Sequence, residues 1–350
     1  MKKKIIWSTI LLILVAGGVI TTKLFRPAID NKKGIFFYIK EGETVIGVKE
    51  ELMYRQFFKS GGSGSFDLAC KILRFKKPKA GRYLLKEGMN AWKLVRKLRS
   101  GDQELVKITI VKERTKELFA GKMGGKKFDL QFDSLQMINY LNNDDSLKKF
   151  GVDTHTVLSV IIPDTYQHKW NSTPDKLMQQ LYASYKKFWN ADRTGKAEKQ
   201  NLTPRQAMIL ASIVEEETNR KDDKLNVASV YINRLREGMR LQADPTVKFI
   251  TRNFQLGRIT GTHLKLESPY NTYLHEGLPP GPICTPSIES IDAVLNAPQT
   301  DYLFFVASYK FDGTSIFTSN LDDHKKYARL FHTEQNRRAD SLRKLKKKQQ

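Results

Sequence analysis

The sequence has few of the residues that usually hold metal ions. Only two cysteines occur in its 350 residues, Cys70 and Cys284, and neither forms a Cys-x-x-Cys or Cys/His cluster. We therefore expect no structural metal site and no cofactor, while a disulfide between the two distant cysteines stays open. The six histidines lack metal-ligand spacing and are interpreted as surface or packing residues: His155, His168, His263, His275, His324 and His332.

Several catalytic motifs are missing as well. There is no Gly-x-Ser-x-Gly and no His-Glu-x-x-His, which argues against the serine hydrolases and the zinc proteases. The Gly/Ser-rich stretch Ser60–Ser65 lacks the Gly-Lys-Ser/Thr ending of a phosphate-binding loop. We interpret this stretch as a flexible turn or as the approach to a helix N-cap.

Acidic residues are outnumbered by basic ones, 37 against 60, and the formal net charge is +23. Such a charge fits nucleic acid, an anionic membrane surface or an acidic polymer as the partner. The N-terminus distinguishes among these, because Lys2–Lys4 precede eighteen uncharged residues, Ile5–Thr22, about the minimum for a spanning helix. The positive-inside rule keeps the lysines in the cytoplasm and exports the rest, so nucleic acid is not the expected partner.

The alternative to a membrane anchor is a cleaved signal peptide. Ala16-Gly17-Gly18 would be a weak cleavage site, but the apolar run continues beyond these residues. We therefore favour an uncleaved, single-pass anchor. The basic C-terminal tail, with few apolar residues, is interpreted as a solvated helix end.

The length predicts about two domains. Three short β-prone runs, each followed by a charged turn and a helical pattern, occur between residues 37 and 123. We interpret them as strand–helix modules of one α+β region, with helices capped by Thr44, Asn90 and Thr115. Residues 190–200 are interpreted as a polar linker.

Two helices are predicted beyond this linker. Thr203 and Pro204 mark a strong start for the first, and Gly238 closes the second. The loops that follow are rich in Pro, Gly, Asn, Thr and aromatic residues, and they form either a binding cleft or ordinary turns. Two strands joined by a turn at Asp312-Gly313 are predicted near the end.

Three adjacent glutamates end the first of these helices. On a helical wheel Glu216 points into solvent, whereas Glu215 and Glu217 lie on the two shoulders of the apolar stripe. Glu217 has Arg220 and Lys221 within helical reach and is expected to be ion-paired, but Glu215 has no cation within helical reach. Desolvation should then raise the pKa of Glu215, which makes it the candidate general acid. On this interpretation Glu216→Gln would be nearly silent and Glu217→Gln intermediate in effect.

A general acid of this kind protonates a glycosidic oxygen in the lysozyme-type reaction, where hydrolysis usually needs a second carboxylate. Asp244 is the nearest candidate in a loop-like context. The alternative is that Asp244 is a turn cap before Pro245, and the residues alone leave both interpretations open.

Six segments, in order and spacing, resemble the endolytic murein transglycosylases (the MltG type): "ASIVEEET", "VYINRL", "MRLQADPT", "PYNTY", "GLPPGPICTPS" and "YLFFVA". "IPDTY" and an anchor followed by a LysM-like segment, residues 36–102, resemble that family too. The resemblance covers nearly the whole chain. It implies an enzyme that cleaves the β-1,4 bond between N-acetylmuramic acid and N-acetylglucosamine in nascent glycan strands and leaves a 1,6-anhydromuramic acid end.

The glutamate after Ser-Ile-Val, which the family uses as acid and then base, is Glu215 in this sequence. This removes the need for a second catalytic carboxylate. Five residues at family motif positions are assigned to sugar binding or site shaping: Asn233, Gln242, Asp244, Tyr270 and Asn271. Tyr270 would stack on a sugar. Glu217 is assigned a supporting role. Glu113 and Cys284 depart from the family pattern, which puts local loop shapes in doubt.

The predicted fold is α+β, with a transmembrane helix, a LysM-like α+β subdomain and a mixed α+β catalytic domain that carries the catalytic glutamate on a helix. The predicted boundaries are a cytoplasmic tail 1–4, an anchor 5–22, a linker 23–35, the LysM-like subdomain 36–102, the catalytic domain 103–335 and a basic tail 336–350. The resemblance implies the inner membrane with a periplasmic catalytic domain, and peptidoglycan strands and peptidoglycan synthases (penicillin-binding proteins) as partners. The rival hypotheses are a non-catalytic wall-binding protein and a cytoplasmic nucleic-acid binder.

Overall fold

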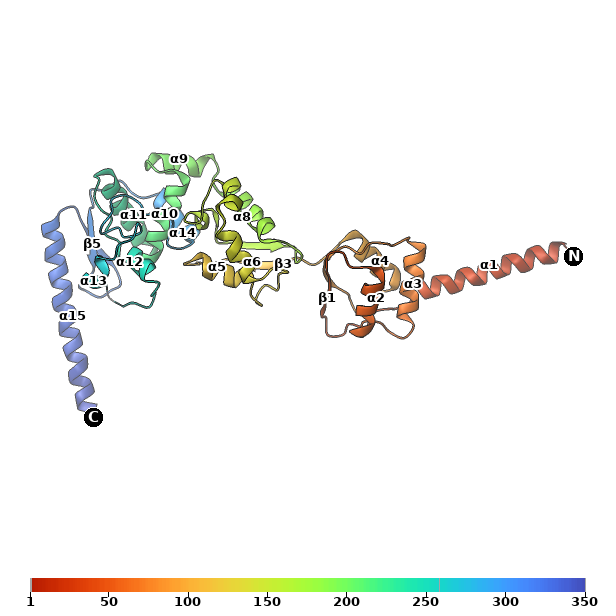
Figure 1. The fold of residues 1–350 in the computed structure, drawn as a ribbon. Coiled ribbons are helices and arrows are strands. Elements are labelled where there is room, and N and C mark those ends of the chain that lie inside the picture. Colours follow the sequence, from red (N-terminus) through yellow and green to blue (C-terminus); the bar gives the residue numbers. More distant parts are fainter. Residues whose placement is uncertain (1, 258, 350) are drawn as a thin grey trace. The chain divides into compact units, whose positions relative to one another are not determined.

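A computed structural model describes residues 2–257 and 259–349. Helices predominate, and the strands of the described residues form two-stranded sheets, so the α+β class is as predicted (Figure 1). The chain divides into two compact units. Unit 1 comprises residues 1–108, 124–133 and 167–173, and unit 2 comprises residues 109–123, 134–166 and 174–350.

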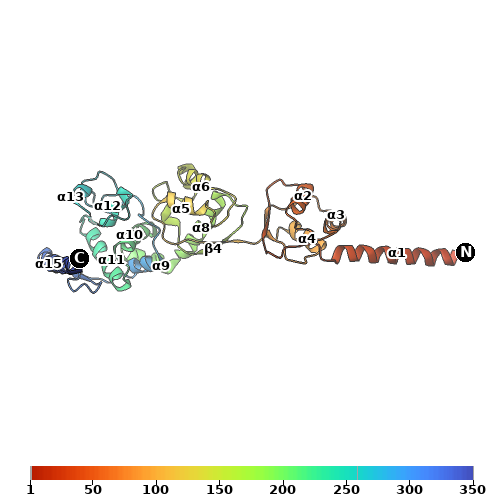
Figure 2. The same ribbon diagram turned by 90° about the horizontal axis from the view of Figure 1, so that it is seen from below.

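The first helix, α1 (Lys2–Phe25), is long and apolar enough to cross a membrane from Lys4 to Phe25. Its most apolar window is not buried inside the protein, and Figure 2 shows α1 leaving the rest of unit 1 as a free-standing helix. These properties fit an anchor and a signal sequence alike.

The C-terminal end of α1 is built into unit 1. Leu24 is 5% exposed and belongs to the hydrophobic core. The ring of Phe25 contacts Trp92 with centroids 6.0 Å apart, and Pro27 pairs with Asn90 in a β-bridge. The first part of the predicted linker 23–35 is therefore packed against the folded unit through Leu24, Ala28 and Ile29, whereas residues 32–35 are exposed.

Unit 1 contains two strand–helix modules around one core. β1 (Phe36–Ile39) pairs antiparallel with β2 (Gly81–Leu84). Three helices complete the core: α2 (Val45–Tyr54), α3 (Gly62–Ile72) and α4 (Ala91–Ser100). The predicted caps are confirmed, because the side chains of Thr44 and Asn90 accept hydrogen bonds from backbone N–H groups of α2 and α4. Gly61 is the N-cap of α3, so the interpretation of the Gly/Ser-rich stretch as the approach to an N-cap is confirmed, and the alternative of a flexible turn is wrong because Gly62–Ser65 are helical.

The third module does not join the first two. β3 (Val106–Thr109) pairs with β4 (Thr165–His168) and not with the β1–β2 sheet. The helix that follows, α5 (Lys116–Met123), belongs to unit 2, and Thr115 caps it by accepting from the N–H of Leu118 at 3.1 Å. The prediction of one α+β region for all three modules is therefore wrong, although the cap is confirmed.

Unit 2 is mainly helical and ends in an antiparallel hairpin and a long helix. Its remaining elements are α6 (Ser134–Leu141), α7 (Asp144–Leu147), η1 (Lys148–Phe150), η2 (Val157–Val160), α8 (Pro174–Phe188), α9 (Ala191–Lys199), α10 (Pro204–Glu217), α11 (Lys221–Arg236), α12 (Asp244–Thr251), α13 (Gly261–Leu264), α14 (Ile288–Leu295), β5 (Phe304–Ala307), β6 (Ser315–Thr318) and α15 (Leu321–Gln349). The β5–β6 hairpin confirms the predicted strand pair.

The segment predicted as a polar linker is the helix α9. Asn190 caps it by accepting from the N–H of Arg193, and Ala197 is buried in the core of unit 2. The linker prediction is wrong because one buried alanine and one good cap outweigh a polar composition. Cys70 and Cys284 are both free thiols, so no disulfide joins them.

The helix α10 is the centre of unit 2. It starts as predicted, with Pro204 in its first turn and a capping box in which Thr203 and Gln206 bond each other's backbone N–H groups. All eight residues from Ala207 to Val214 are buried, because α10 packs against α11, α12 and α14. The helix is therefore covered on all sides, not on a single stripe. Gly238, with φ of +68°, follows the end of α11 as predicted.

Candidate active site

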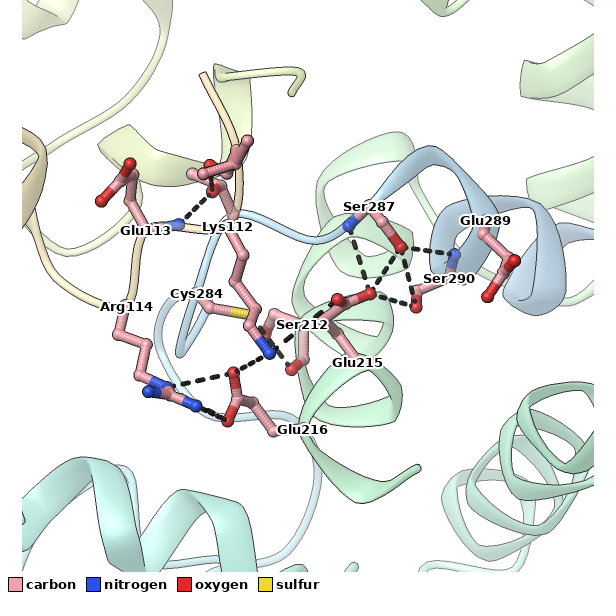
Figure 3. A network of polar contacts seen from close by, with 12 residues as sticks. Lys112, Glu113, Arg114, Ser212, Glu215, Glu216, Cys284, Ser287, Glu289 and Ser290 are labelled. Carbon is pink, nitrogen blue, oxygen red and sulfur yellow. Dashed lines mark hydrogen bonds and ion pairs between the residues drawn. The ribbon is translucent and has the colours of Figure 1, made fainter. Parts of the chain in front are cut away.

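The carboxylate of Glu215 is anchored at the start of α14. Glu215 lies in the last turn of α10, and its side chain is 12% exposed. Its Oε2 accepts hydrogen bonds from the hydroxyls of Ser287 and Ser290, each at 2.5 Å, and from the N–H of Ser287 at 3.3 Å (Figure 3). Ser287 is also the N-cap of α14, so the carboxylate faces the positive end of that helix.

Two lysines flank this carboxylate. Lys224 Nζ lies 3.5 Å from Oε2 of Glu215, and Lys112 Nζ lies 4.0 Å from Oε1. Burial has the largest influence on the pKa of Glu215 and raises it, but the two hydroxyls and the two ammonium groups together lower the pKa below its usual value. The predicted raised pKa of Glu215 is therefore wrong, because α10 has no cation within helical reach of Glu215 but other segments place two lysines beside it.

Glu216 is ion-paired, not solvated. Its side chain is 15% exposed and lies 3.0 Å from Lys112 Nζ. It also accepts hydrogen bonds from Arg114, from Nε at 3.2 Å and from Nη2 at 3.1 Å. The wheel prediction is wrong because other segments cover the side of α10 that it assigned to solvent. Since Glu216→Gln would remove the charge that both cations contact, there is no longer a reason to expect a silent effect.

A contact between two backbone segments fixes the origin of these cations. The N–H of Thr285 donates to the carbonyl of Glu113 at 2.9 Å, and the N–H of Glu113 donates to the Thr285 hydroxyl at 2.8 Å. Lys112 and Arg114 are the chain neighbours of Glu113, so this contact sets where both side chains begin. Glu113 is itself buried and ion-paired with Lys122.

Glu217 has a third environment. It accepts a hydrogen bond from the Tyr231 hydroxyl at 2.5 Å. Part of the residue reaches solvent, but its carboxyl group is enclosed by protein, and this desolvation raises its pKa to about 7, with a further contribution from Asp244. The ion pairs predicted with Arg220 and Lys221 do not occur in the described part of the chain, where both cations are exposed.

A hollow of about 430 Å³ lies beside the three glutamates. Its lining includes Lys112, Arg114, residues 215–220 and Gly313. Oε2 of Glu215 is occupied by hydroxyls, whereas Oε1 has only the Lys112 ammonium at 4.0 Å among the described residues. Oε1 is therefore the oxygen that a molecule in this hollow can use.

Comparison with known proteins identifies the family. The model of the YceG-like family matches residues 37–330. This chain belongs to the YceG-like family. An endolytic murein transglycosylase of Bacillus subtilis is 30% identical over 315 residues, which cover 85% of this chain and 84% of that protein.

Two further comparisons agree with this assignment. A protein of the same name from Streptococcus pneumoniae is 27% identical over 322 residues, and the match covers 84% of this chain but only 58% of that longer protein. The solved structure of a yceG-like protein from Listeria monocytogenes shares the fold, with a TM-score of 0.54 at 24% identity. That match covers 84% of this chain and 99% of the other.

Two predicted site residues of this YceG-like chain are engaged by the protein itself. Asn233 Nδ2 donates to the carbonyls of Thr300 and Tyr302 at 2.9 and 3.0 Å. Asn271 is fully buried, and its Nδ2 donates to two carbonyls of the preceding loop at 2.8 and 3.1 Å. Both amides hold loops in place, which fits site shaping better than direct contact with a sugar.

The other predicted residues are more accessible or line a different hollow. Gln242 is exposed and has a φ of +51°. Asp244 is the first residue of α12, so its predicted loop-like context is wrong, and it accepts from the Tyr273 hydroxyl at 2.6 Å. Tyr270 is 9% exposed, and its ring packs on Phe249 with centroids 4.8 Å apart.

Six residues that contact the glutamates are not among the predicted site residues: Lys112, Arg114, Lys224, Tyr231, Ser287 and Ser290. Ser287 carries a usable signal, because a serine before an apolar run is typical of a helix N-cap. The cations carry no such signal, since Arg114 is 102 residues away from Glu216 in the chain.

Glu217→Gln should change stability in a pH-dependent way. The folded protein keeps the Glu217 proton up to about pH 7, whereas the unfolded chain loses it near 4.5, so the wild type loses stability as the pH rises between these values. The amide cannot ionise but still accepts from Tyr231. The variant should therefore gain up to about 3 kcal/mol over the wild type above pH 7 and little below pH 4.5.

Chemical denaturation at a series of pH values measures this difference in the free energy of unfolding. Glu237→Gln is the matched control, because Glu237 is exposed at the end of α11. The control should show no such trend. A constant difference between Glu217→Gln and the wild type at every pH would contradict the raised pKa.

Proposed function

We propose that this chain is a membrane-anchored endolytic lytic transglycosylase. It would cleave the β-1,4 bond between N-acetylmuramic acid and N-acetylglucosamine in nascent peptidoglycan. The product strand would end in 1,6-anhydro-N-acetylmuramic acid, which stops elongation of that strand. The family and the names of the curated relatives support murein transglycosylase activity.

The environment of Glu215 is the observation that carries the mechanism. One carboxylate oxygen is fixed by Ser287 and Ser290, so the group cannot rotate freely. The other oxygen is left open beside the hollow of about 430 Å³. A fixed carboxylate with one open oxygen suits a group that gives a proton and then takes one back at nearly the same place.

In the proposed reaction, protonated Glu215 gives its proton to the glycosidic oxygen as the bond from that oxygen to C1 breaks. The resulting carboxylate then takes the proton of the C6 hydroxyl of N-acetylmuramic acid while the C6 oxygen bonds to C1. Glu215 ends protonated, as it began, so no water is consumed and no second catalytic carboxylate is needed. Asp244, bound to Tyr273, stays outside the chemistry.

The acid step needs the protonated form of Glu215, but the free enzyme favours the carboxylate because the pKa of Glu215 is lowered. Lys112 is the adjustable partner. Its side chain is 32% exposed and lies nearer to Glu216, at 3.0 Å, than to Glu215, at 4.0 Å. A glycan in the hollow would exclude water and move Lys112 towards Glu216, and both changes raise the pKa of Glu215.

The rest of the chain is assigned by the same proposal. We take α1 as an uncleaved anchor with a cytoplasmic N-terminus, residues 36–102 as a LysM-like subdomain and residues 103–335 as a periplasmic catalytic domain. Gln242 and Tyr270 are assigned to sugar contact, with Asn233, Asn271 and Glu217 in support. The net charge of +23 favours an anionic wall polymer or membrane, and a peptidoglycan synthase is the expected partner by family analogy alone.

Glu215→Gln should abolish cleavage. Removal of an acid–base group costs about 10²–10⁴-fold in rate, and this variant loses both steps. The full-length protein is incubated with uncrosslinked murein strands, and anhydro-ended fragments are counted by mass spectrometry. Glu237→Gln is the control and should retain activity. Absence of anhydro ends with the wild type would favour a non-catalytic wall-binding protein.

Lys112→Gln should shift the pH dependence of activity. If free Glu215 must be protonated, kcat/KM falls as the pH rises above the pKa of Glu215. Loss of the Lys112 ammonium raises this pKa, so the falling limb should move to higher pH. Lys112→Arg keeps the charge and should leave the limb in place. Identical profiles for Lys112→Gln and the wild type would rule out this role of Lys112.

A further inference from the structure

A second hollow, of about 270 Å³, lies in unit 2 around Tyr270. Its lining includes Lys116, His155, Arg252 and Pro282. We call it the Tyr270 hollow. It is smaller than a typical site for a whole small molecule, about 300–1,000 Å³, so it suits one residue of a polymer better than a free ligand.

The Tyr270 hollow and the hollow beside Glu215 are both neighbours of a further, smaller hollow. A third hollow of about 190 Å³ shares Arg114 and Glu216 with the Glu215 hollow, and it shares Phe249 with the Tyr270 hollow. The three hollows therefore lie in a row on unit 2, which is the arrangement that a long polymer with one bond at Glu215 would need to reach the Tyr270 hollow.

The Tyr270 hollow holds two cations, Arg252 and Lys116, and one carboxylate, Glu117, whose pKa both cations help to lower. The Arg252 guanidinium lies 4.5 Å from the centre of the Phe249 ring, and Phe249 packs in turn on Tyr270. Lys116 Nζ donates to the carbonyl of Thr154 at 3.3 Å. Neither cation forms a salt bridge within residues 2–257 and 259–349. The two cations outnumber Glu117 in the lining, and a guanidinium that stacks on a ring suits bidentate binding of a second carboxylate.

We propose that the Tyr270 hollow binds a carboxylate of the peptide that murein carries on its N-acetylmuramic acid. This inference rests on the proposed function. The two amino sugars of the glycan are uncharged once peptide-substituted, so in such strands the peptide carboxylates are the anions that Arg252 and Lys116 can select. An amidase frees the lactyl carboxylate instead, and this anion lies directly on the sugar and not at the end of a peptide. The enzyme would then distinguish strands with peptides from strands that have lost them. The Tyr270 hollow, and not Glu215, would provide this selectivity.

The test compares two substrates for the full-length protein in detergent: glycan strands with peptides, and the same strands after an amidase has removed the peptides. The wild type should have a kcat/KM about tenfold higher on the first, since a hydrogen bond to a charged group contributes about 1.5–3 kcal/mol. Arg252→Gln should reduce this preference to about twofold or less, and Lys116→Gln should reduce it partly. The matched control Arg236→Gln, at the exposed end of α11, should keep it.

Equal rates of the wild type on both substrates would overturn the inference while leaving the proposed function standing. An Arg252→Gln variant that slows both substrates by the same factor would overturn it too, because that result indicates a sugar contact or a structural role.

Binding provides a readout that does not depend on cleavage. Fluorescence anisotropy with Glu215→Gln should show tighter binding of peptide-bearing strands than of strands without peptides or with amidated peptide carboxylates. The double variant Glu215→Gln/Arg252→Gln should lose this difference. If the wild type cleaves neither substrate, the proposed function fails, yet equal binding of the three strands would still refute the carboxylate site and unequal binding would support it.

Discussion

The segment from Ile283 to Ser287 holds the candidate active site together. Every second residue of it bonds a different part of the site: Ile283 donates to the Ser212 hydroxyl at 3.0 Å, Thr285 pairs with Glu113, and Ser287 donates to Glu215. The first and last of these contacts lie one turn apart on α10, so the segment runs along the end of that helix. The middle contact, between Thr285 and Glu113, holds the loop that carries Lys112 and Arg114 next to the glutamates. Without this segment Glu215 would lose the Ser287 hydroxyl, and the backbone that carries Lys112 and Arg114 would lose its contact with Thr285.

Three consecutive glutamates acquire three different electrostatic states from this arrangement. Hydroxyls and ammonium groups lower the pKa of Glu215, Glu216 is paired with two cations, and enclosure raises the pKa of Glu217 to about 7. Successive helical residues are about 100° apart, so each side chain meets a different neighbouring segment. Environments that push the pKa values of neighbouring carboxyls apart are typical of acid–base sites.

Local signals in the sequence predicted local structure well. Thr203 and Pro204 predicted the start of α10, and the turn at Asp312-Gly313 predicted the β5–β6 hairpin, because caps and turns depend on only a few adjacent residues. The environment of Glu215 was not predictable in this way, although the helical wheel and the motif resemblance both selected Glu215 as the candidate acid. A helical wheel assumes one buried face, whereas α10 is buried all round and its partners come from distant segments. The helix α9 was missed for a related reason, since its single buried alanine leaves no periodic pattern.

The burial of Leu24 has a mechanical consequence. Because the last turn of α1 is part of the core of unit 1, no swivel separates the apolar helix from the first folded unit. In the anchor role proposed for α1, the depth and tilt of the helix in the bilayer would also set the height and the orientation of unit 1 above the lipid. The proposed anchor would then hold unit 1 rigidly instead of through a flexible linker, and the thickness of the membrane would affect the position of unit 1.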